Sequence, residues 1–405
     1  MKSKIDLKEY KLSKLLEIKN GKDHQNLSDG KYPVYGSGGI MRYVDCFLYD
    51  KPSILLPRKG SLTNIQFCDV PFWTVDTTYY TMVDDTLANP YYLYRYLSLL
   101  DLSRLDSGTG VPSMTFDSYY NIKVKLPDLT TQRQLATILR NLDDKIALNR
   151  AINQNLESLA KQLYDYWFVQ FDFPNEEGKP YKSCGGAMAY NENLKRNIPE
   201  GWIDGIFADI ANITMGQSPD GSSYNETGEG VIFYQGSTDF GIRFPSVRMY
   251  TTSPTRFAKQ GDILMSVRAP VGAVNIANTD CCIGRGLSAI NSKIGSITYI
   301  YCVVHYLKVR FDSLNTAGTT FGSITKDELF NLPVVIPSND VIERFEAICK
   351  PIFDKQMEIG FEIESLTKQR DELLPLLMTG QVSLNSDLYV LNNFTFRVEF
   401  STGLF

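Results

Sequence analysis

Few side chains of the types that carry out catalysis are present in this chain of 405 residues. His24 and His305 are the only histidines, and the seven cysteines include no C-x2-C pair. Histidine-based triads and histidine metal sites need several such groups close together, and a disulfide framework normally uses an even number of cysteines. The residue types therefore argue against a hydrolase, a metalloenzyme and a disulfide-bonded secreted domain.

Two short motifs have residue types found in catalytic sites, but each has a simpler interpretation. Asn89–Tyr92 (NPYY) is similar to the Asn-Pro-Pro-aromatic motif of amino-methyltransferases, yet it lacks the second proline and a preceding glycine-rich loop. An Asn cap with Pro in the first helical turn explains the same residues. Pro219 and Asp220, followed by Glu226, are similar to a nuclease cluster but lack its lysine. No G-x4-G-K-S/T loop is present, so we expect no catalytic site, no metal and no bound cofactor.

Composition and charge predict a globular protein of the cytoplasm. The chain is 43% apolar and 21% charged, which is ordinary for a folded protein of two or three domains. No apolar run reaches the length of a membrane span, and the N-terminus has no signal-like segment. The net charge of −5 is unexpected for a protein that wraps nucleic acid alone, although residues 1–60 hold 12 Lys and Arg against 7 Asp and Glu.

The elements that must position the polar residues are short strands and two long helices. The helices are predicted from about residue 129 to 168 and from about 339 to 379, each preceded by a capping residue. Apolar, β-branched runs bounded by Gly and Pro predict strands. These runs are SILLP (53–57), NIKVKLP (121–127), GDILMSV (261–267) and LPVVIP (332–337).

The chain is an internal duplication. A shift of 210 residues places Arg58 on Arg268 and residues 107–127 on 317–337. The positions that are identical in the second of these stretches include, in first-copy numbers, Gly108, Thr109, Ser113, Thr115, Asp117, Asn121 and Pro127. Further upstream the shift is near 200, so one copy contains an insertion relative to the other. An ordered series of matches at one shift indicates two copies of one domain.

Each copy ends in a helix with a narrow apolar stripe, which indicates a coiled coil. The first stripe consists of Leu135, Leu142, Asn149, Leu156 and Leu163, with Ile138, Ile152 and Leu159 beside it. The second consists of Phe345, Ile352, Ile359, Leu366 and Leu373, with Val341, Ile348 and Leu376 beside it. The favoured partner of each helix is the other one. Asn149 either fixes their register or is satisfied locally, and roughly 35 residues make a rod about 50 Å long.

The predicted fold class is α+β, with two duplicated mixed α/β domains separated by two long helices that form an antiparallel coiled coil. The predicted segments are a first domain (1–128), a helical spacer (129–170), a linker (171–198), a second domain (199–337), a second helical spacer (338–380) and a tail of unknown role (381–405). Within that tail, residues 393–400 alternate apolar and polar side chains like an edge strand.

This layout resembles the DNA-specificity subunits of type I restriction-modification systems over nearly the whole chain. Residues 163–202 carry the strongest similarity, through a WF-F-FP run, a small-residue turn at Cys184–Gly186 and the segment IPEGW. Residues 215–225, 267–277 and 372–384 are also similar. The resemblance implies that each domain reads one half of a bipartite DNA target, while the helices set the gap and dock two methyltransferase subunits in the prokaryotic cytoplasm. Restriction subunits are further expected partners, and S-adenosylmethionine, ATP and Mg would be bound by the partners.

Polar glycine-bearing loops and a few basic residues are the candidates for DNA contact. Backbone N–H groups and hydroxyls can bind phosphates, whereas Arg can pair bidentately with guanine and Lys acts as a point charge. The candidates are Ser37, Gly38, Arg58, Lys59 and Thr109 in the first copy and Gln217, Ser218, Arg268, Arg285, Thr319 and Thr320 in the second. Ordinary turns are the alternative for the loops, and a structural salt bridge is the alternative for the arginines.

Two other functions remain open from the sequence. One is the recognition region of a self-contained methyltransferase or restriction enzyme, although the missing glycine-rich loop argues against it. The other is a structural adaptor that uses two similar domains to bind proteins instead of DNA.

Overall fold

The computed structural model describes residues 6–60, 62–105, 112–316 and 322–381. The chain divides into two compact units, which are described separately: unit 1 is residues 1–147 with 365–405, and unit 2 is residues 148–364. The long helices α3 (Leu129–Tyr164) and α7 (Asn339–Met378) each contribute one end to each unit. The residues predicted to form strand 393–400 lie outside the described part. Within that part, no helix is long and apolar enough to cross a membrane.

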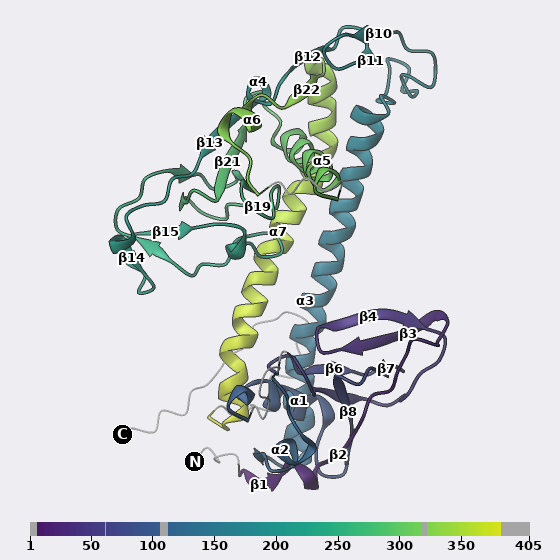
Figure 1. The fold of residues 1–405 in the computed structure, drawn as a ribbon, viewed down its shortest axis with the longest axis vertical. Coiled ribbons are helices and arrows are strands. Elements are labelled where there is room, and N and C mark those ends of the chain that lie inside the picture. The colour runs from purple at the N-terminus through teal and green to yellow at the C-terminus, as the bar shows by residue number, and fades with distance from the viewer. Residues whose placement is uncertain (1–5, 61, 106–111, 317–321, 382–405) are drawn as a thin grey trace. The chain divides into compact units, whose positions relative to one another are not determined.

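The first repeat, in unit 1, contains three sheets and two short helices (Figure 1). The four-stranded sheet has the order β2 (Leu16–Lys19), β8 (Thr78–Val83), β5 (Ser53–Pro57), β6 (Gln66–Cys68). The three-stranded sheet has the order β4 (Gly39–Val44), β3 (Asp29–Gly36), β7 (Trp73–Thr74). Strands β1 (Lys8–Lys11) and β9 (Lys123–Leu126) pair separately, and the helices are α1 (Pro90–Ser98) and α2 (Phe116–Tyr120). Strand β5, the predicted SILLP run, is buried along its whole length, as expected of a central strand.

The second repeat, in unit 2, has the same plan. Its four-stranded sheet has the order β13 (Ala211–Met215), β21 (Leu287–Ser292), β18 (Ile263–Ser266), β19 (Val274–Ile276). Its five-stranded sheet has the order β14 (Tyr224–Asn225), β16 (Tyr250–Thr251), β15 (Val231–Tyr234), β20 (Cys281–Ile283), β17 (Phe257–Ala258). Strand β12 (Ile203–Ile206) pairs with β22 (Pro333–Ile336), and the helices are α4 (Phe207–Ile210), α5 (Ile297–Thr316) and α6 (Lys326–Phe330).

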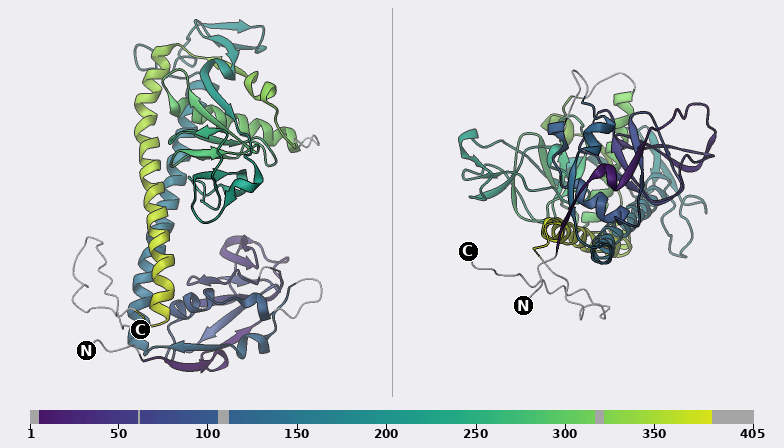
Figure 2. Two further views of the ribbon diagram at one scale, coloured as in Figure 1. Left: turned by 90° about the vertical axis from the view of Figure 1, so that its left-hand side faces the viewer. Right: turned by 90° about the horizontal axis from the view of Figure 1, so that it is seen from below.

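The two repeats agree in topology as well as in sequence. In the first, β3 runs parallel to β7, and in the second, β15 runs parallel to β20, while the four-stranded sheets are antiparallel throughout. Each of the four predicted strand runs contains an observed strand. The predicted duplicated α+β fold is therefore confirmed, and in each unit the sheets lie to the side of the helix pair (Figure 2).

The segment predicted as a linker, residues 171–198, contributes to the core of unit 2. Phe171 and Phe173 are buried, and their rings lie 5.7 and 5.0 Å from that of Trp202. Strand β10 (Met188–Asn191) pairs within this segment with β11 (Arg196–Pro199). The aromatic residues therefore fasten the end of α3 to the second repeat.

Helices α3 and α7 pair in the antiparallel sense in both units. In unit 1, Nη1 of Arg370 lies 3.1 Å from Oδ1 of Asp143, and in unit 2, Nδ2 of Asn149 donates to Oε2 of Glu362 at 2.9 Å. Residue numbers rise along one helix as they fall along the other, which confirms the predicted orientation. Asn149 is 2% exposed, and its bond crosses to the other helix. This contact favours the register-fixing interpretation over local satisfaction.

The predicted main stripe of each helix is buried. The second row beside it was predicted one residue before the row that is buried in the structure. On both helices the predicted main row is buried or half-buried throughout. The row beside it that is buried lies four residues further along, and consists on α3 of Gln132, Leu139, Ile146, Asn153 and Ala160. On α7 it consists of Cys349, Gln356, Ile363 and Leu377, with Arg370 half-buried between them.

The predicted flanking row, three residues further along, was therefore wrong for Ile152, Leu159 and Ile348, which are exposed, whereas Val341 is buried as predicted and Ile138 and Leu376 are half-buried. Ile348 is 45% exposed and Ile138 is only half-buried, while Ile152 and Leu159 are 37% and 44% exposed. Positions three and four residues away are both neighbours on a helix, so residue type alone favoured the more apolar row. The helix instead buries polar residues, of which Gln132 is hydrogen-bonded and Asn153 has no side-chain partner among the described residues. Gln132 accepts from the Asn89 backbone N–H at 2.9 Å.

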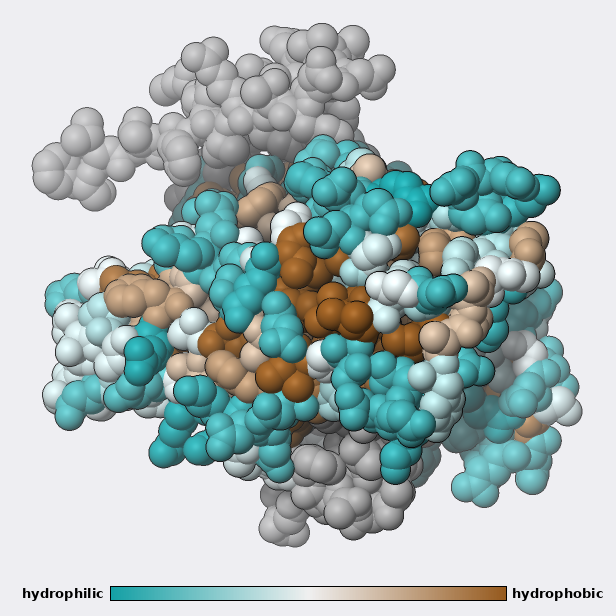
Figure 3. Space-filling model, turned by 90° about the horizontal axis from the view of Figure 1, so that it is seen from above, coloured by the Kyte–Doolittle hydropathy of each residue, from teal (hydrophilic) through white to brown (hydrophobic). Residues whose placement is uncertain are grey.

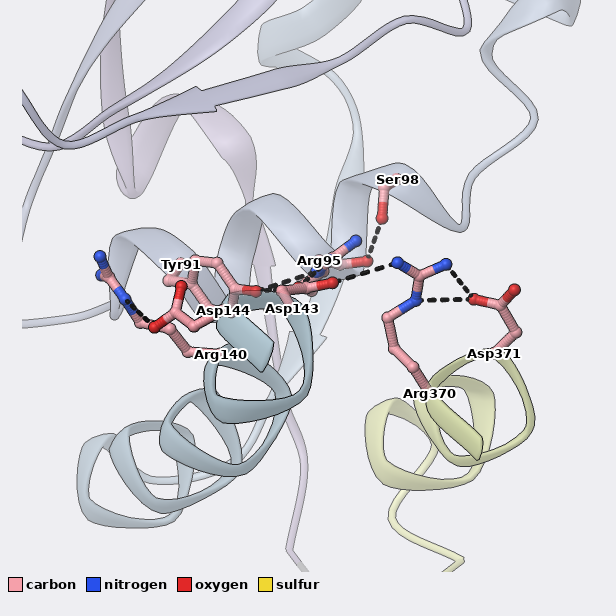
Figure 4. A network of polar contacts seen from close by, with 8 residues as sticks. All are labelled: Tyr91, Arg95, Ser98, Arg140, Asp143, Asp144, Arg370 and Asp371. Carbon is pink, nitrogen blue, oxygen red and sulfur yellow. Dashed lines mark hydrogen bonds and ion pairs between the residues drawn. The ribbon is translucent and has the colours of Figure 1, made fainter. Parts of the chain in front are cut away.

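A charged network joins the first repeat to both helices within unit 1 (Figure 4). Asp143 on α3 accepts from Arg95 and from the Tyr91 hydroxyl, both on α1, and forms an ion pair with Arg370 on α7. The side chains of Arg95, Asp143 and Arg370 are 12%, 20% and 20% exposed. Arg370 also pairs with Asp371, which is 58% exposed. One carboxylate thus balances two largely buried guanidinium groups.

Candidate nucleic-acid interface

Loops that follow the strand ends place the described first-repeat candidates in two pockets. Ser37 and Gly38 form the turn between β3 and β4 and line a pocket with His24 and Asp76. Asn64 donates to the Ser37 carbonyl at 2.6 Å, which fixes the turn. Thr109 lies outside the described residues.

A neighbouring pocket of the first repeat contains Arg58 and Lys59, directly after β5. Nη1 of Arg58 donates to the Asp76 carbonyl at 3.2 Å, and the guanidinium lies 6.0 Å from the centre of the Tyr79 ring. Burial raises the pKa of Tyr79. Asn20 also lines this pocket. Arg58 is thus partly held by its own repeat, whereas Lys59 extends into solvent.

The second-repeat candidates also converge. Ser218, Arg268 and Arg285 line one pocket together with Tyr224 and Gln235. The Arg285 backbone N–H donates to Oγ of Ser218 at 3.3 Å. Both arginine side chains are exposed. Adjacent to Ser218, Gln217 is exposed and donates its backbone N–H to the Ile283 carbonyl at 3.0 Å. Thr319 and Thr320 lie outside the described residues.

Backbone hydrogen bonds correct the predicted correspondence between Arg58 and Arg268. The Arg58 N–H donates to the Thr77 carbonyl at 2.9 Å, and the Val267 N–H donates to the Gly286 carbonyl at the same distance. Arg58 therefore corresponds to Val267, and Lys59 corresponds to Arg268. The shift is 209 residues here and is 210 again at α2 and α6, because the whole segment from β21 to α6 has one residue more than that from β8 to α2. A single fixed shift could not detect this.

Equivalent hydrogen bonds also reveal interface residues that the sequence reasoning missed. The Lys22 N–H donates to the Thr74 carbonyl at 2.8 Å, as the Gln217 N–H does to that of Ile283, so Lys22 and Gln217 correspond. Gly36 and Gln235 correspond in the same way. They follow Tyr35 and Tyr234, whose carbonyls accept from the equivalent N–H groups of Val75 and Gly284. The shifts are 195 and 199 residues, so an alignment that allowed gaps would have found these pairs.

The glycines preceding Lys22 and Gln217 make close backbone approaches. A Cβ atom on Gly21 would lie 2.0 Å from the Val75 carbonyl oxygen, and one on Gly216 would lie 2.2 Å from that of Gly284. Both distances are far below van der Waals contact. The same local packing therefore fixes the interface loop in both repeats.

We expect Gly216→Ala to displace the loop that carries Gln217 and Ser218. The added methyl group cannot fit beside the Gly284 carbonyl, so unit 2 should lose about 1–3 kcal/mol of stability. Hydrogen exchange of the β13 and β20 amides in the full chain would measure this loss. Gly221→Ala is the matched control, because its Cβ would meet nothing within 4 Å. Equal protection in the two variants would contradict the packing argument.

The salt-bridge alternative for the basic candidates finds no support. Among the described residues, the ion pairs include none made by Arg58, Lys59, Arg268 or Arg285. These cations can therefore meet an anionic ligand without first breaking an ion pair.

The two motifs with catalytic residue types serve local structure. The Asn89 side chain caps α1 by accepting from the Tyr92 N–H at 2.9 Å. Asp220 accepts from the N–H and hydroxyl of Ser222, and these bonds lower the pKa of its carboxyl group. The described residues contain no group of three or more His, Cys, Asp or Glu side chains placed to hold a metal ion.

Comparisons with known proteins agree with this two-repeat architecture. The family model described as "Type I restriction modification DNA specificity domain" matches residues 4–158 and again residues 199–359. The MjaX specificity subunit of Methanocaldococcus jannaschii is 33% identical over 280 residues, which are 66% of this chain and 60% of that relative. The type I restriction enzyme MjaIX specificity subunit of the same organism is 24% identical over 357 residues, which are 83% of this chain and 78% of the relative.

A solved structure supports the fold. The type I restriction-modification S subunit from M. genitalium matches with a TM-score of 0.62 at 16% identity, over 93% of this chain and 97% of that chain. The family model covers most of this chain, once for each repeat. The chain therefore belongs to the family of the type I restriction modification DNA specificity domain.

Proposed function

We propose that this chain is the DNA-specificity subunit of a type I restriction-modification complex, in which each repeat reads one half of a bipartite target. The observation that carries the proposal is that each repeat has a loop pocket lined by exposed cations, Lys59 in the first repeat and Arg268 and Arg285 in the second, which form no ion pair among the described residues. Arg and Lys in polar loops bind phosphates and base edges. The chain itself contributes recognition and no chemistry, while partner subunits bind S-adenosylmethionine and, for restriction, ATP with Mg.

Methylome sequencing of prokaryotic cells that express this chain with its modification subunit tests the proposal. We expect methylation at one motif of two short specified blocks separated by unspecified bases. Cells that lack this chain but keep the modification subunit are the control. Methylation at a contiguous site, or methylation that does not depend on this chain, would contradict the bipartite model.

The surface of unit 2 supports the docking of a helical partner on the spacer. On α3, Leu148, Ile152 and Leu159 are 56%, 37% and 44% exposed and repeat at helical spacing, and Tyr166, in the π-helical turn that follows α3, is 38% exposed. Such a stripe fits the apolar face of a second helix. Apolar side chains also gather on the face of the molecule seen in Figure 3, and Ile203 of β12 is 60% exposed. We propose that the modification subunit covers the stripe on α3.

We expect the double variant Ile152→Gln, Leu159→Gln to bind the modification subunit at least tenfold more weakly, which corresponds to about 1.4 kcal/mol of lost apolar burial. The fold should persist, because both side chains are already partly in solvent. Titration of the purified subunits would measure the affinity. Gln154→Ala, which changes an exposed residue on the opposite side of α3, is the matched control. Equal affinities of the two variants would remove this stripe from the interface.

A further inference from the structure

One pair of equivalent positions differs in charge between the pocket that contains Ser37 and Asp76 and the pocket that contains Ser218 and Arg285. Asp76 precedes Thr77, whose carbonyl accepts from Arg58, and Arg285 precedes Gly286, whose carbonyl accepts from Val267. Directly before Asp76 and Arg285 in the chain, the Val75 N–H donates to the Tyr35 carbonyl at 3.0 Å and the Gly284 N–H donates to the Tyr234 carbonyl at 2.8 Å. Equivalent bonds thus bracket Asp76 and Arg285. The pair reverses charge at a position fixed by backbone pairing in both repeats.

The neighbouring pair of positions keeps its charge. The side chains of Lys59 and Arg268 are both exposed. The backbone of Lys59 forms an isolated antiparallel β-bridge with Ser113, and that of Arg268 forms one with Ser323. Phosphates are present along any DNA sequence, so a contact to them needs the same positive charge in both repeats. Lys59 and Arg268 fit this requirement. A residue that must recognise different bases in the two halves has no such constraint.

The chemistry of Asp76 and Arg285 suits the reading of different bases. Both side chains are exposed, and neither forms an ion pair among the described residues. The guanidinium group has only donors and can pair with O6 and N7 of guanine, whereas a carboxylate has only acceptors and can accept from N4 of cytosine. Gln235, which lines the Arg285 pocket, adds an amide at a position where the first repeat has Gly36.

We propose that Asp76 and Arg285 are equivalent specificity-determining residues, with Arg285 reading a guanine in one half of the target and Asp76 reading a cytosine in the other. Lys59 and Arg268 contact the phosphate backbone at the corresponding places. This assignment rests on the proposed function, and it adds that the two half-sites differ at this position because the repeats place opposite charges there.

Methylome sequencing of Arg285→Ala beside Arg268→Ala tests the assignment in the full complex. With Arg285→Ala, one guanine of the second half-site should become unspecified, while the first half-site stays unchanged. The preference for that guanine over other bases should fall by roughly 5- to 150-fold in binding assays. With Arg268→Ala, the motif should stay the same, affinity should fall for all sequences, and the salt slope should decrease by about one.

Asp76→Ala provides the reciprocal measurement, because it should relax one cytosine in the first half-site only. Circular dichroism and complex formation check that each variant is folded and assembled. An unchanged motif with Arg285→Ala, in a complex whose wild type methylates a bipartite site, would overturn this assignment and leave the proposed function standing. Absence of a bipartite motif in the wild type would overturn the proposed function itself.

Discussion

Exchange of residues 1–128 for the corresponding segment of a relative with a different target is expected to change one half of the methylated motif and to leave the other half unchanged. Among the described residues, strands β1 to β9 pair only with one another, and all lie within this segment. A half-site of about three base pairs contributes roughly 3–9 kcal/mol, so the former half-site should lose at least a hundredfold in preference. Methylome sequencing measures both halves at once.

The exchanged segment must keep its contacts with the two helices. Leu135 and Leu139 of α3, with Leu374 and Leu377 of α7, belong to the core of the first repeat. The donor relative should therefore have the same apolar surface facing these positions. Exchange of residues 199–337 is the reciprocal control and should change only the other half. Loss of both halves in a chain that still assembles would contradict independent recognition by the repeats.

The fold was predictable because the duplication supplies an internal comparison. Strand runs such as SILLP and the matching of residues 107–127 to 317–337 identified equivalent segments without any relative. The comparison failed where one copy has an additional residue, which moved the partner of Arg58 from Val267 to Arg268. Sequence alone gave no reason to insert a gap between β21 and α6. Hydrogen bonds between strands define the correspondence, and they depend on the folded sheet.

The helix rows were only partly predictable for a different physical reason. A row of leucines identifies one side of a helix, but its neighbours at three and four residues are nearly equivalent in geometry. Ile348 is more apolar than Gln356, yet Ile348 is 45% exposed and Gln356 is 2% exposed. The exposed row makes sense if a partner covers it. Residue type reports the total apolar surface, including surface that other subunits bury.

The candidate interface was predictable as residue types but not as an arrangement. Arg268, Arg285 and Ser218 are separated in sequence and meet in one pocket. The family resemblance implied a domain that reads DNA, but it did not imply which residues meet. Asp76 and Gln235 carried no signal of their own, since an acidic residue and an amide are common in loops. Their positions became informative only when backbone bonds aligned the two repeats.

Asp143→Ala is expected to destabilise the attachment of the first repeat to the helices by about 2–3 kcal/mol. The change leaves Arg95 and Arg370 close together without their shared carboxylate, and loss of one partner of a buried ion pair typically costs 3–5 kcal/mol. A value below that range is expected because these side chains are 12–20% exposed. Hydrogen exchange of the α1 amides in the full chain would measure the loss.

Two further variants separate the cost of unpaired charge from the net value of the network. Asp371→Ala removes a carboxylate that also pairs with Arg370 but is 58% exposed, so it should cost less than about 1 kcal/mol. The triple variant Arg95→Met, Asp143→Leu, Arg370→Met removes every charge and should recover most of the stability lost in Asp143→Ala, because apolar side chains of similar size can replace a buried ion network. If the triple variant is no more stable than Asp143→Ala, geometry specific to the network, rather than unpaired charge, holds α1 against the helices.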